Sequence, residues 1–457
     1  MDTDRNLTSG SLDIAETVDG VPAAEAVVKM RSSKKETELP RKKNADGYLW
    51  GIYLVILMFS IVELYSASST EVTSKSLYGP LISHAKFLVM GLGIMYFFQR
   101  LHYRVFRKWA WFAAIVCACL VILSNYVGVN INGAQRALSL PGGFTIQPPE
   151  IAKLAVVLVL ARIMAKYQKD GGVTTRGIIE SAVVVAVFAG LLWRNGLTNT
   201  IILMVVSVAM FVIGGIEWKK LLIVLAVYGV CVAGVYGITH SAPEAQGDEF
   251  EQLSSGSETE VKKTGVDRTE TRENRFASFI KGVNPDDDLT DENRQVFFSN
   301  IAQAHGGIFG NGPGSSRESA RLPLAFSDYI FSIIIEDTGF VGGVILLLCY
   351  LMFPLRSGTI AGKCSRAFPA LLIMGCSVLI ITQALIHMAI ATGLFPVSGQ
   401  PLPFISKGGT SILVMSAALG MMLSVSRYAV RNGNKKDINN ELRGLPVDIQ
   451  SANPMQL

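Results

Sequence analysis

Three clusters of polar residues lie at the edges of long apolar segments, and they contain the side chains best suited to chemistry. The first cluster runs from Arg136 to Lys153. Glu150 and Lys153 are three residues apart at the start of a predicted helix, so they share one face of it. With Arg136 upstream, two cations and an acid could hold a pyrophosphate, because arginine binds phosphate in bidentate fashion and lysine acts as a point charge. An intrahelical ion pair near the membrane interface explains Glu150 and Lys153 equally well.

The second cluster combines a glycine-rich stretch, His305–Gly314, with Ser327 and Asp328 just before another apolar segment. The glycines by themselves indicate only a tight loop. Asp328 is predicted in the first turn of the helix that follows. A helix cap explains Ser or Asp at this place without any chemistry. A carboxylate that is partly desolvated at the outer membrane face would instead suit a general base.

The third cluster, Gly393–Ser411, places three prolines and four glycines between two apolar segments. Such a run cannot be regular helix. Irregular backbone at membrane depth is tolerated only where it is buried in protein or lines a cavity. Just before this run, Gln383 and His387 are four residues apart on a predicted helix. Hydrogen bonding between helices is the preferred interpretation of His387.

The elements that position these clusters are predicted to be membrane helices. Half of the residues are apolar and 17% are charged, whereas about one quarter are charged in soluble domains. A spanning helix needs about 20 mostly apolar residues, and several of the candidates are short enough to require tilt or a thinned bilayer. The ten candidate segments are Tyr48–Ser66, Ser83–Phe98, Trp109–Val127, Ile151–Lys166, Gly177–Trp193, Thr200–Gly215, Leu221–Ile238, Ile330–Phe353, Pro369–Ala389 and Ser411–Ser426.

Basic residues precede the first segment and follow every even-numbered one, whereas the odd-numbered exits are mostly free of them. Cytoplasmic loops carry an excess of Lys and Arg, so this pattern predicts ten spans with both termini in the cytoplasm. The basic residues are Arg41, Lys42, Lys43, Arg100, Arg104, Arg107, Lys108, Lys166, Lys169, Arg176, Lys219, Lys220, Arg356, Lys363, Arg366, Arg427, Arg431, Lys435 and Lys436.

The predicted fold is an all-α polytopic membrane domain over residues 47–431, with flexible cytoplasmic extensions at 1–46 and 432–457. A long external loop, 240–329, joins the seventh and eighth segments. Its acidic first part is predicted to be disordered, and its second part to form short amphipathic helices on the membrane surface. No cleavable signal peptide is expected, because the first 45 residues are polar.

Charge and cysteine content exclude two other classes of protein. The net charge of +5 is too small, and too spread along the chain, to indicate binding to nucleic acid. The six cysteines form no CxxC pair, and all but Cys364 lie in apolar runs. A disulfide framework or a zinc site is therefore not expected.

In this order, the three clusters resemble the motifs of the SEDS family (shape, elongation, division and sporulation), and above all its division-type members. The resemblance covers about residues 47 to 430. The residues that carry it are Gly133–Arg136, Gln147–Glu150, Ser327–Phe331, Glu336–Gly339 and Gly393–Ser411. The variants Ala325–Asp328 and Ser406–Gly409 look like those of Bacteroidetes members.

The chain also departs from the family pattern. Ala137, Pro149, Phe326 and Lys407 replace the residues usual at those positions. The stretch Arg194–Thr200 lacks the acidic residue of the family, so no acidic role is carried over to it. Asp328 is unaffected by these departures.

The resemblance implies a peptidoglycan glycosyltransferase that polymerises lipid II. The family's proposed catalytic aspartate corresponds to Asp328. It would remove the proton from the 4-hydroxyl of the acceptor sugar, while undecaprenyl pyrophosphate leaves and the configuration inverts. Glu150 is expected to orient Lys153 or Arg136, and a divalent cation (Mg²⁺ or Mn²⁺) could assist, although no ligand cluster specifies one. The residues expected to contact the substrate are Arg136, Glu150, Lys153 and Ser327, with Arg275, Arg317 and Lys407 as weaker candidates.

The resemblance also implies partners: a class B penicillin-binding protein with transpeptidase activity, other membrane proteins of the divisome, and membrane lipid. The expected location is the bacterial inner membrane at the division septum. A lipid II flippase and a non-catalytic divisome scaffold are the alternatives. A transporter should place essential charges near the membrane midplane, whereas Arg136, Lys153 and Asp328 gather toward the outer face, which favours an enzyme.

Overall fold

The computed structural model describes residues 44–68, 79–127, 129–131, 134–139, 145–169, 172–193, 195–241, 279–280, 291–322 and 325–428. The chain divides into two units, residues 1–44 and 45–457, and the fold described below is that of the second. Residues 1–43 and 432–457 of the predicted cytoplasmic extensions, and the acidic part of the external loop, lie outside the described residues.

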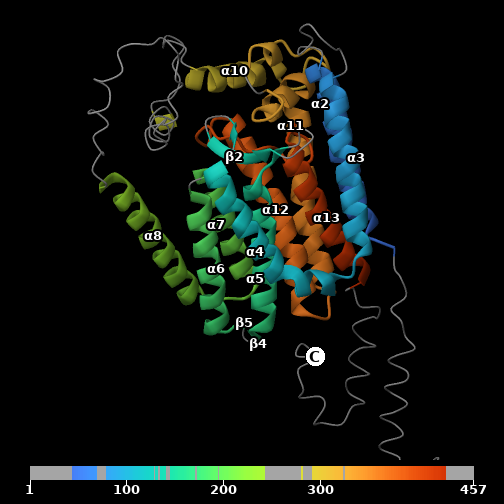
Figure 1. Ribbon diagram of the computed structural model, residues 1–457. Coiled ribbons are helices and arrows are strands. Elements are labelled where there is room, and N and C mark those ends of the chain that lie inside the picture. The colour runs from blue at the N-terminus through green and yellow to red at the C-terminus, as the bar shows by residue number, and fades with distance from the viewer. Residues whose placement is uncertain are drawn as a thin grey trace, which may run out of the picture. The chain divides into compact units, whose positions relative to one another are not determined.

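Every one of the ten predicted segments coincides with a helix (Figure 1). Among the described helices, α4, α6, α11, α12 and α13 are long and apolar enough to cross a membrane. The chain is therefore a multi-pass, mostly helical membrane protein, and the count of ten spans stays a prediction. The ten helices are α2 (Gly47–Ser68), α3 (Gly79–Arg100), α4 (Tyr103–Val127), α5 (Pro148–Lys166), α6 (Thr175–Trp193), α7 (Leu197–Ile213), α8 (Trp218–Ser241), α11 (Ile330–Ala361), α12 (Ala367–Ala391) and α13 (Gly409–Tyr428).

The helices differ in how much of their surface they bury, and this difference identifies the centre of the bundle. The most apolar stretches of α12 and α13 are 78% and 89% buried, against 28–33% for α4, α6 and α11. Figure 1 shows α4 to α7 on one side of α12 and α2 with α3 on the other. Small residues permit close packing of α3 on α13: a Cβ added to Gly91 would lie 2.7 Å from Ser416 Oγ. Such small contacts replace the hydrophobic effect as the source of helix association in lipid.

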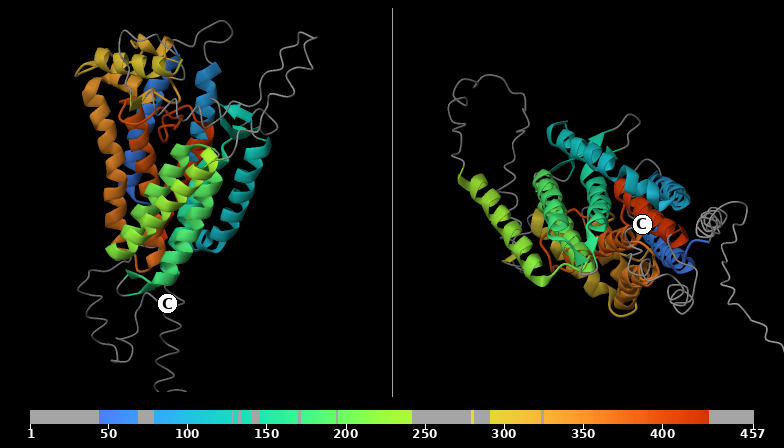
Figure 2. Two further views of the ribbon diagram at one scale, coloured as in Figure 1. Left: turned by 90° about the vertical axis from the view of Figure 1, so that its left-hand side faces the viewer. Right: turned by 90° about the horizontal axis from the view of Figure 1, so that it is seen from below.

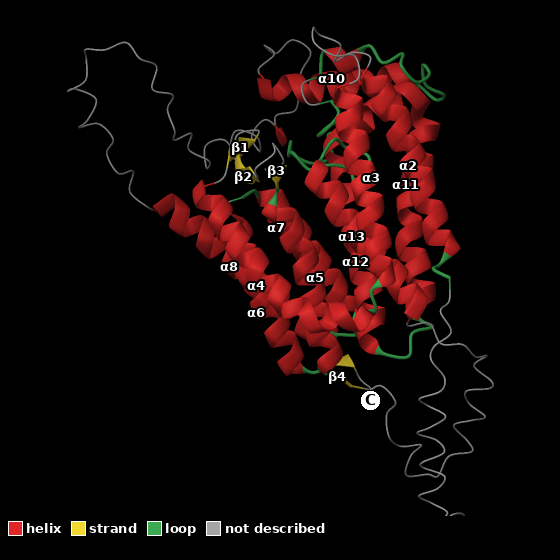
Figure 3. Cartoon of the chain, turned by 45° about the vertical axis from the view of Figure 1, so that its right-hand side comes forward, coloured by secondary structure: helices red, strands yellow, loops and turns green. Residues whose placement is uncertain are grey.

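Short strands accompany the helices at both ends of the bundle, and the all-α prediction missed them. Antiparallel β1 (Val129–Ile131), β2 (Ala134–Ser139) and β3 (Thr145–Ile146) form one sheet between α4 and α5. They lie at the same end as α10 (Asp291–Gly306), which crosses the helix ends in Figures 1 and 3. We call this the outer end. The hairpin of β4 (Gln168–Lys169) and β5 (Gly172–Val173) lies at the inner end.

The inner end is held by an ion pair near the start of α2. Asp46 Oδ1 accepts hydrogen bonds from the backbone N–H groups of Tyr48 and Leu49, which caps the helix. Asp46 Oδ2 also lies 2.6 Å from a guanidinium nitrogen of Arg356 on α11. The basic exits gather at this end, so the positive-inside rule predicts that it faces the cytoplasm.

Candidate active site at the outer end

Asp328 lies in a turn, residues 325–328, that precedes α11. The helix begins at Ile330 and Tyr329 is its cap residue, without a side-chain capping bond. The prediction that Asp328 occupies the first helical turn is therefore wrong, because α11 starts two residues later. Asp328 is 7% exposed, and its Oδ1 accepts a hydrogen bond of 2.6 Å from Ser327 Oγ. Asp328 thus lies one residue before the cap residue of α11.

The segment between α12 and α13, residues 393–408, holds the Asp328 turn in place; we call it the proline loop. Ser406 Oγ donates a hydrogen bond of 2.8 Å to the carbonyl of Ser327, and the backbone N–H of Lys407 donates to the carbonyl of Phe326 at 2.9 Å. The Lys407 side chain is exposed, with its Nζ 5.9 Å from the centre of the Phe326 ring. The second and third clusters of the sequence thus form one structure, with a cation beside the turn that carries Asp328.

Polar side chains of α12 form hydrogen bonds with the backbone of the proline loop. Gln383 Nε2 donates to the carbonyl of Pro401 at 3.1 Å. His387 Nδ1 lies 2.7 Å from the carbonyl oxygen of Gln400. The hydrogen-bonding interpretation of His387 is confirmed, although its partner is loop backbone and not another helix. Phe404, with φ of 67°, is fully buried and packs edge-on against Tyr53 at 5.3 Å, so the surrounding core holds its left-handed backbone in place.

The first cluster is also connected to the proline loop, through hydrogen bonds inside the bundle. Lys153 is fully buried, and its Nζ donates to Glu150 Oε1 at 2.7 Å and to Gln383 Oε1 at 3.0 Å. The predicted pair of Glu150 and Lys153 is confirmed as geometry. Because Gln383 in turn binds Pro401, the Lys153 ammonium supports the loop from inside the bundle. Contact of Lys153 with a substrate stays a prediction.

The remaining predicted cations have different positions. Arg136 lies in β2, and its side chain is outside the described part of the chain, as is the whole of Arg275. Arg317 is exposed at the outer end, where its backbone N–H donates to Glu336 Oε1 at 2.8 Å. Of these residues, Arg317 is the one whose side chain the structure places at the outer surface.

The glycine-rich stretch has a structural role that the sequence did not reveal: it supplies hydrogen-bond partners for the backbone where α11 is interrupted. At Gly339, φ is 74° and ψ is −179°, so the helix is interrupted. The backbone groups freed by the break pair with the glycine loop: Gly312 N–H donates to the carbonyl of Asp337 at 2.9 Å, and Phe340 N–H to that of Gly307 at 2.9 Å. A Cβ added to Gly310 would lie 2.3 Å from the Asp337 carbonyl oxygen, so the approach requires glycine.

Buried carboxylates that were not among the predicted site residues line this break. Glu336 accepts a hydrogen bond of 2.6 Å from Ser316 Oγ, and Asp337 accepts one from Ser66 Oγ. Glu63 is also fully buried, and its two oxygens have no hydrogen-bond partner among the described residues. The signal available in the sequence was the occurrence of these acids inside otherwise apolar segments. No group of three or more His, Cys, Asp or Glu in the described residues is arranged to hold a metal ion.

An apolar groove of about 560 Å³ runs into the membrane region from the outer end, between α3, α4, α5 and α13. Thr145 and Thr410 line its polar end, and Thr410 Oγ1 donates to the carbonyl of Thr145 at 3.0 Å. Phe98, Cys117 and Met421 line it farther along. The groove therefore begins close to the proline loop, since Thr410 follows that loop by two residues.

The fold and this site define a class: a polytopic membrane protein with an acidic site under a proline-rich loop at one membrane face. Residues 47–431 match the cell cycle protein family that comprises FtsW, RodA and SpoVE, and the chain belongs to this family. It is 28% identical to stage V sporulation protein E of Bacillus subtilis (strain 168), over 85% of this chain and 99% of that one. It is 29% identical to the probable peptidoglycan glycosyltransferase FtsW of Trichlorobacter lovleyi, over 83% and 93% of the two chains.

Two solved structures have a similar fold. A chain from a peptidoglycan synthase complex that coordinates polymerization and crosslinking has a TM-score of 0.63 at 22% identity, covering 84% of this chain and 98% of that one. The rod shape determining protein RodA of Thermus thermophilus has a TM-score of 0.58 at 22% identity, covering 86% and 100%. These similarities support the fold.

Proposed function

We propose that this protein is a peptidoglycan glycosyltransferase that polymerises lipid II during septal wall synthesis. Several relatives carry the name peptidoglycan glycosyltransferase. The observation in the structure that carries the proposal is the placement of Asp328. It is a buried carboxylate on a turn that two hydrogen bonds fasten to the proline loop, and the ammonium of Lys407 lies 5.9 Å from the ring centre of Phe326 in the same turn.

In the proposed reaction, Asp328 acts as general base. Its carboxylate takes the proton of the acceptor's sugar 4-hydroxyl as that oxygen bonds to the anomeric carbon of the donor. The bond from the anomeric carbon to the pyrophosphate oxygen breaks, and undecaprenyl pyrophosphate leaves with the electron pair. Attack from the opposite face inverts the configuration. The hydrogen bond from Ser327 Oγ to Oδ1 orients the carboxylate for this proton transfer.

The leaving pyrophosphate requires positive charge, because charge develops on it in the transition state. Lys407 is the cation that the proline loop presents beside the turn that carries Asp328, so it becomes the first candidate for this role. Arg136, Arg275 and Arg317 stay predicted contacts. A divalent cation, Mg²⁺ or Mn²⁺, would bind chiefly through the substrate's own phosphates, because the described protein residues supply no ligand cluster.

Lys153 and Glu150 are assigned a positioning role. Both side chains are at most 2% exposed, and Lys153 reaches the proline loop through Gln383. We assign the prenyl chain of lipid II to the apolar groove between α3, α4, α5 and α13, whose polar end at Thr145 and Thr410 lies by the proline loop. A chain lying there would keep the pyrophosphate at the outer end.

The proposed partners follow from family membership and from the similar synthase complex. A class B penicillin-binding protein would crosslink the glycan strands that this protein makes, and other divisome membrane proteins would recruit it to the septum of the inner membrane. The similar solved chain comes from a complex that joins polymerization to crosslinking.

The test is lipid II polymerisation by the purified protein with its cognate transpeptidase, comparing wild type with Asp328→Asn and Asp328→Glu. Asparagine keeps the shape of the side chain but cannot accept the proton, so a loss of 10²–10⁴-fold is expected. Glutamate restores a base at a shifted position and should recover part of the activity. Equal products from wild type and Asp328→Asn would remove Asp328 from the mechanism. No product from any of the three, despite bound partner, would favour the flippase or scaffold.

A further inference from the structure

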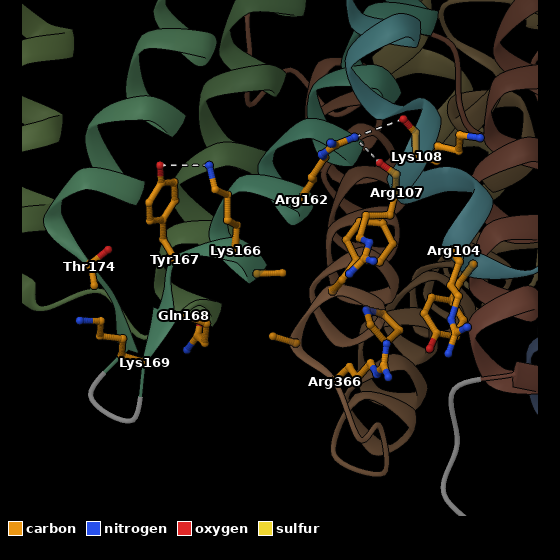
Figure 4. A pocket seen from close by; sticks show the side chains of 15 residues that line it. Arg104, Arg107, Lys108, Arg162, Lys166, Tyr167, Gln168, Lys169, Thr174 and Arg366 are labelled. Atoms are coloured by element: carbon orange, nitrogen blue, oxygen red, sulfur yellow. Dashed lines mark hydrogen bonds between the residues drawn. The ribbon is translucent and has the colours of Figure 1, made fainter. Parts of the chain in front are cut away.

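A second site lies at the inner end of the bundle, far from Asp328. A pocket of about 990 Å³ opens between α4, the end of α5 with its β4–β5 hairpin, and the start of α12 (Figure 4). The inner and outer ends of α5 are separated by 16 residues from Glu150 to Lys166, or about 24 Å of helix. In the view from below, the inner ends of the helices face the reader (Figure 2).

The lining of this pocket is strongly basic. From α4 come Arg104, Arg107 and Lys108, from α5 and the hairpin Arg162, Lys166 and Lys169, and from the start of α12 Arg366. None of the described lining residues is acidic. Figure 4 shows Lys166 and Lys169 on one side of the opening, with Arg104, Arg107 and Arg366 on the other.

Most of these cations are not used to hold the protein together. Arg162 is used, since its guanidinium donates to the backbone carbonyls of Arg107 at 2.6 Å and Lys108 at 3.2 Å. Lys166 also has a partner, since its Nζ donates to Tyr167 Oη at 3.3 Å. By contrast, the side chains of Arg104, Arg107 and Arg366 make no hydrogen bond or ion pair with other described residues. Like charges repel, so such a group without an anion is unfavourable. The arrangement therefore points to an anionic ligand.

Two further features increase the positive potential in the pocket. The helix α12 begins there, and its first residues Ala367, Phe368 and Pro369 line the pocket. Its cap residue Arg366 forms no side-chain capping bond, so the positive end of a 25-residue helix is available to an anion. Burial, and then the charges of Arg104 and Arg366, lower the pKa of the neighbouring His102, as expected where positive charge accumulates.

The surface next to the pocket indicates that the anion carries apolar chains. Along α4, Arg104, Lys108, Trp111 and Ile115 follow each other at spacings of four, three and four residues, so they form one stripe. Trp111 is 42% exposed and Ile115 is 61% exposed. The stripe thus passes from cations to an interfacial tryptophan and then to apolar surface, as expected for a ligand with a phosphate head and acyl chains.

We propose that this pocket binds the phosphate groups of an anionic phospholipid from the leaflet at the inner end. A headgroup with two phosphates, as in cardiolipin, would use cations from both sides of the opening. Basic pockets between membrane helices on the cytoplasmic side are a known mode of such recognition. The proposal does not depend on the reaction at Asp328.

The test compares lipid binding by the full-length protein in neutral detergent with that of Arg104→Gln/Arg366→Gln. The matched control, Lys219→Gln/Lys363→Gln, removes two exposed charges at basic exits that do not line the pocket. Each protein is titrated with cardiolipin, with phosphatidylethanolamine and with inorganic pyrophosphate, and bound lipid is counted by native mass spectrometry. Thermal melting without lipid checks that each variant is folded.

Wild type and control should bind cardiolipin with equal affinity, and the pocket variant should bind it about 25-fold more weakly, at about fivefold for each cation removed. Phosphatidylethanolamine should bind poorly to all three proteins. Equal cardiolipin binding by the pocket variant and the control would overturn the proposal. Pyrophosphate that competes fully with cardiolipin at equal concentration would also overturn it, because the site would then recognise a soluble anion and not a lipid.

Discussion

Replacing Lys153 by methionine tests whether a buried ion pair supports the active-site loop. The ammonium is fully buried, 2.7 Å from Glu150 Oε1 and 3.0 Å from Gln383 Oε1. Methionine fills a similar volume, so packing changes little, but the Glu150 carboxylate loses its cation. Leaving one member of a buried pair uncompensated costs about 3–5 kcal/mol. For a chain of this size we expect a decrease in Tm of about 3–5 °C.

The companion variants separate charge from shape. In Glu150→Gln/Lys153→Met no buried charge is left alone, and we expect stability within about 1 kcal/mol of wild type. Lys166→Met makes the same substitution at the exposed inner end of α5 and should change stability by about 0.5 kcal/mol or less. Additive effects of Glu150→Gln and Lys153→Met, without recovery in the double variant, would refute the coupling.

Activity distinguishes support of the loop from contact with the substrate. If Lys153 acts through Gln383 and Pro401, Lys153→Met should lower kcat with little change in the KM for lipid II, because the loop mispositions Asp328. The double variant should recover part of kcat together with its stability. A large rise in KM in both variants, with stability restored in the double one, would show that the ammonium binds the pyrophosphate directly.

Two further predictions concern the break in α11 and the inner end. Gly339→Ala would place a Cβ 2.3 Å from the Ile308 carbonyl oxygen, at a residue whose φ is 74°. We therefore expect this variant to lose about 3 kcal/mol or more of stability, which a lower Tm would report. In the control Gly358→Ala, in the same helix, the added Cβ meets no atom within 4 Å, so the Tm should not change. Burial raises the pKa of Asp46, but hydrogen bonding and charge from Arg356 outweigh it, and the net pKa lies below its ordinary value of 3.8. Asp46 therefore stabilises the fold above pH 3.8, and the Tm difference between wild type and Asp46→Asn should vanish as the pH falls below that value; a difference that persists in acid would contradict this account.

The sequence determined the elements of this protein because hydropathy acts locally. A segment of about 20 apolar residues has to be helical in lipid, since every backbone group must find its partner within the segment. All ten predicted segments are helices for this reason. Two ends differ most from the prediction. The helix α4 begins at Tyr103 and not at Trp109, and α11 continues past Phe353 to Ala361, because Pro354 is accommodated inside the helix. The pair of Glu150 and Lys153 was also predictable, since residues three apart share a helix face.

The tertiary structure decided how the polar clusters combine. The contact from Ser406 to Ser327 joins residues 79 apart in the chain, and that from Lys153 to Gln383 joins residues 230 apart. No spacing rule specifies such pairs, because a buried polar group requires a partner but does not determine which segment supplies it. The same holds for the basic pocket. The positive-inside rule assigned all of its cations except Arg162 to the inner end, and only the packing of α4, α5 and α12 brought them around one cavity.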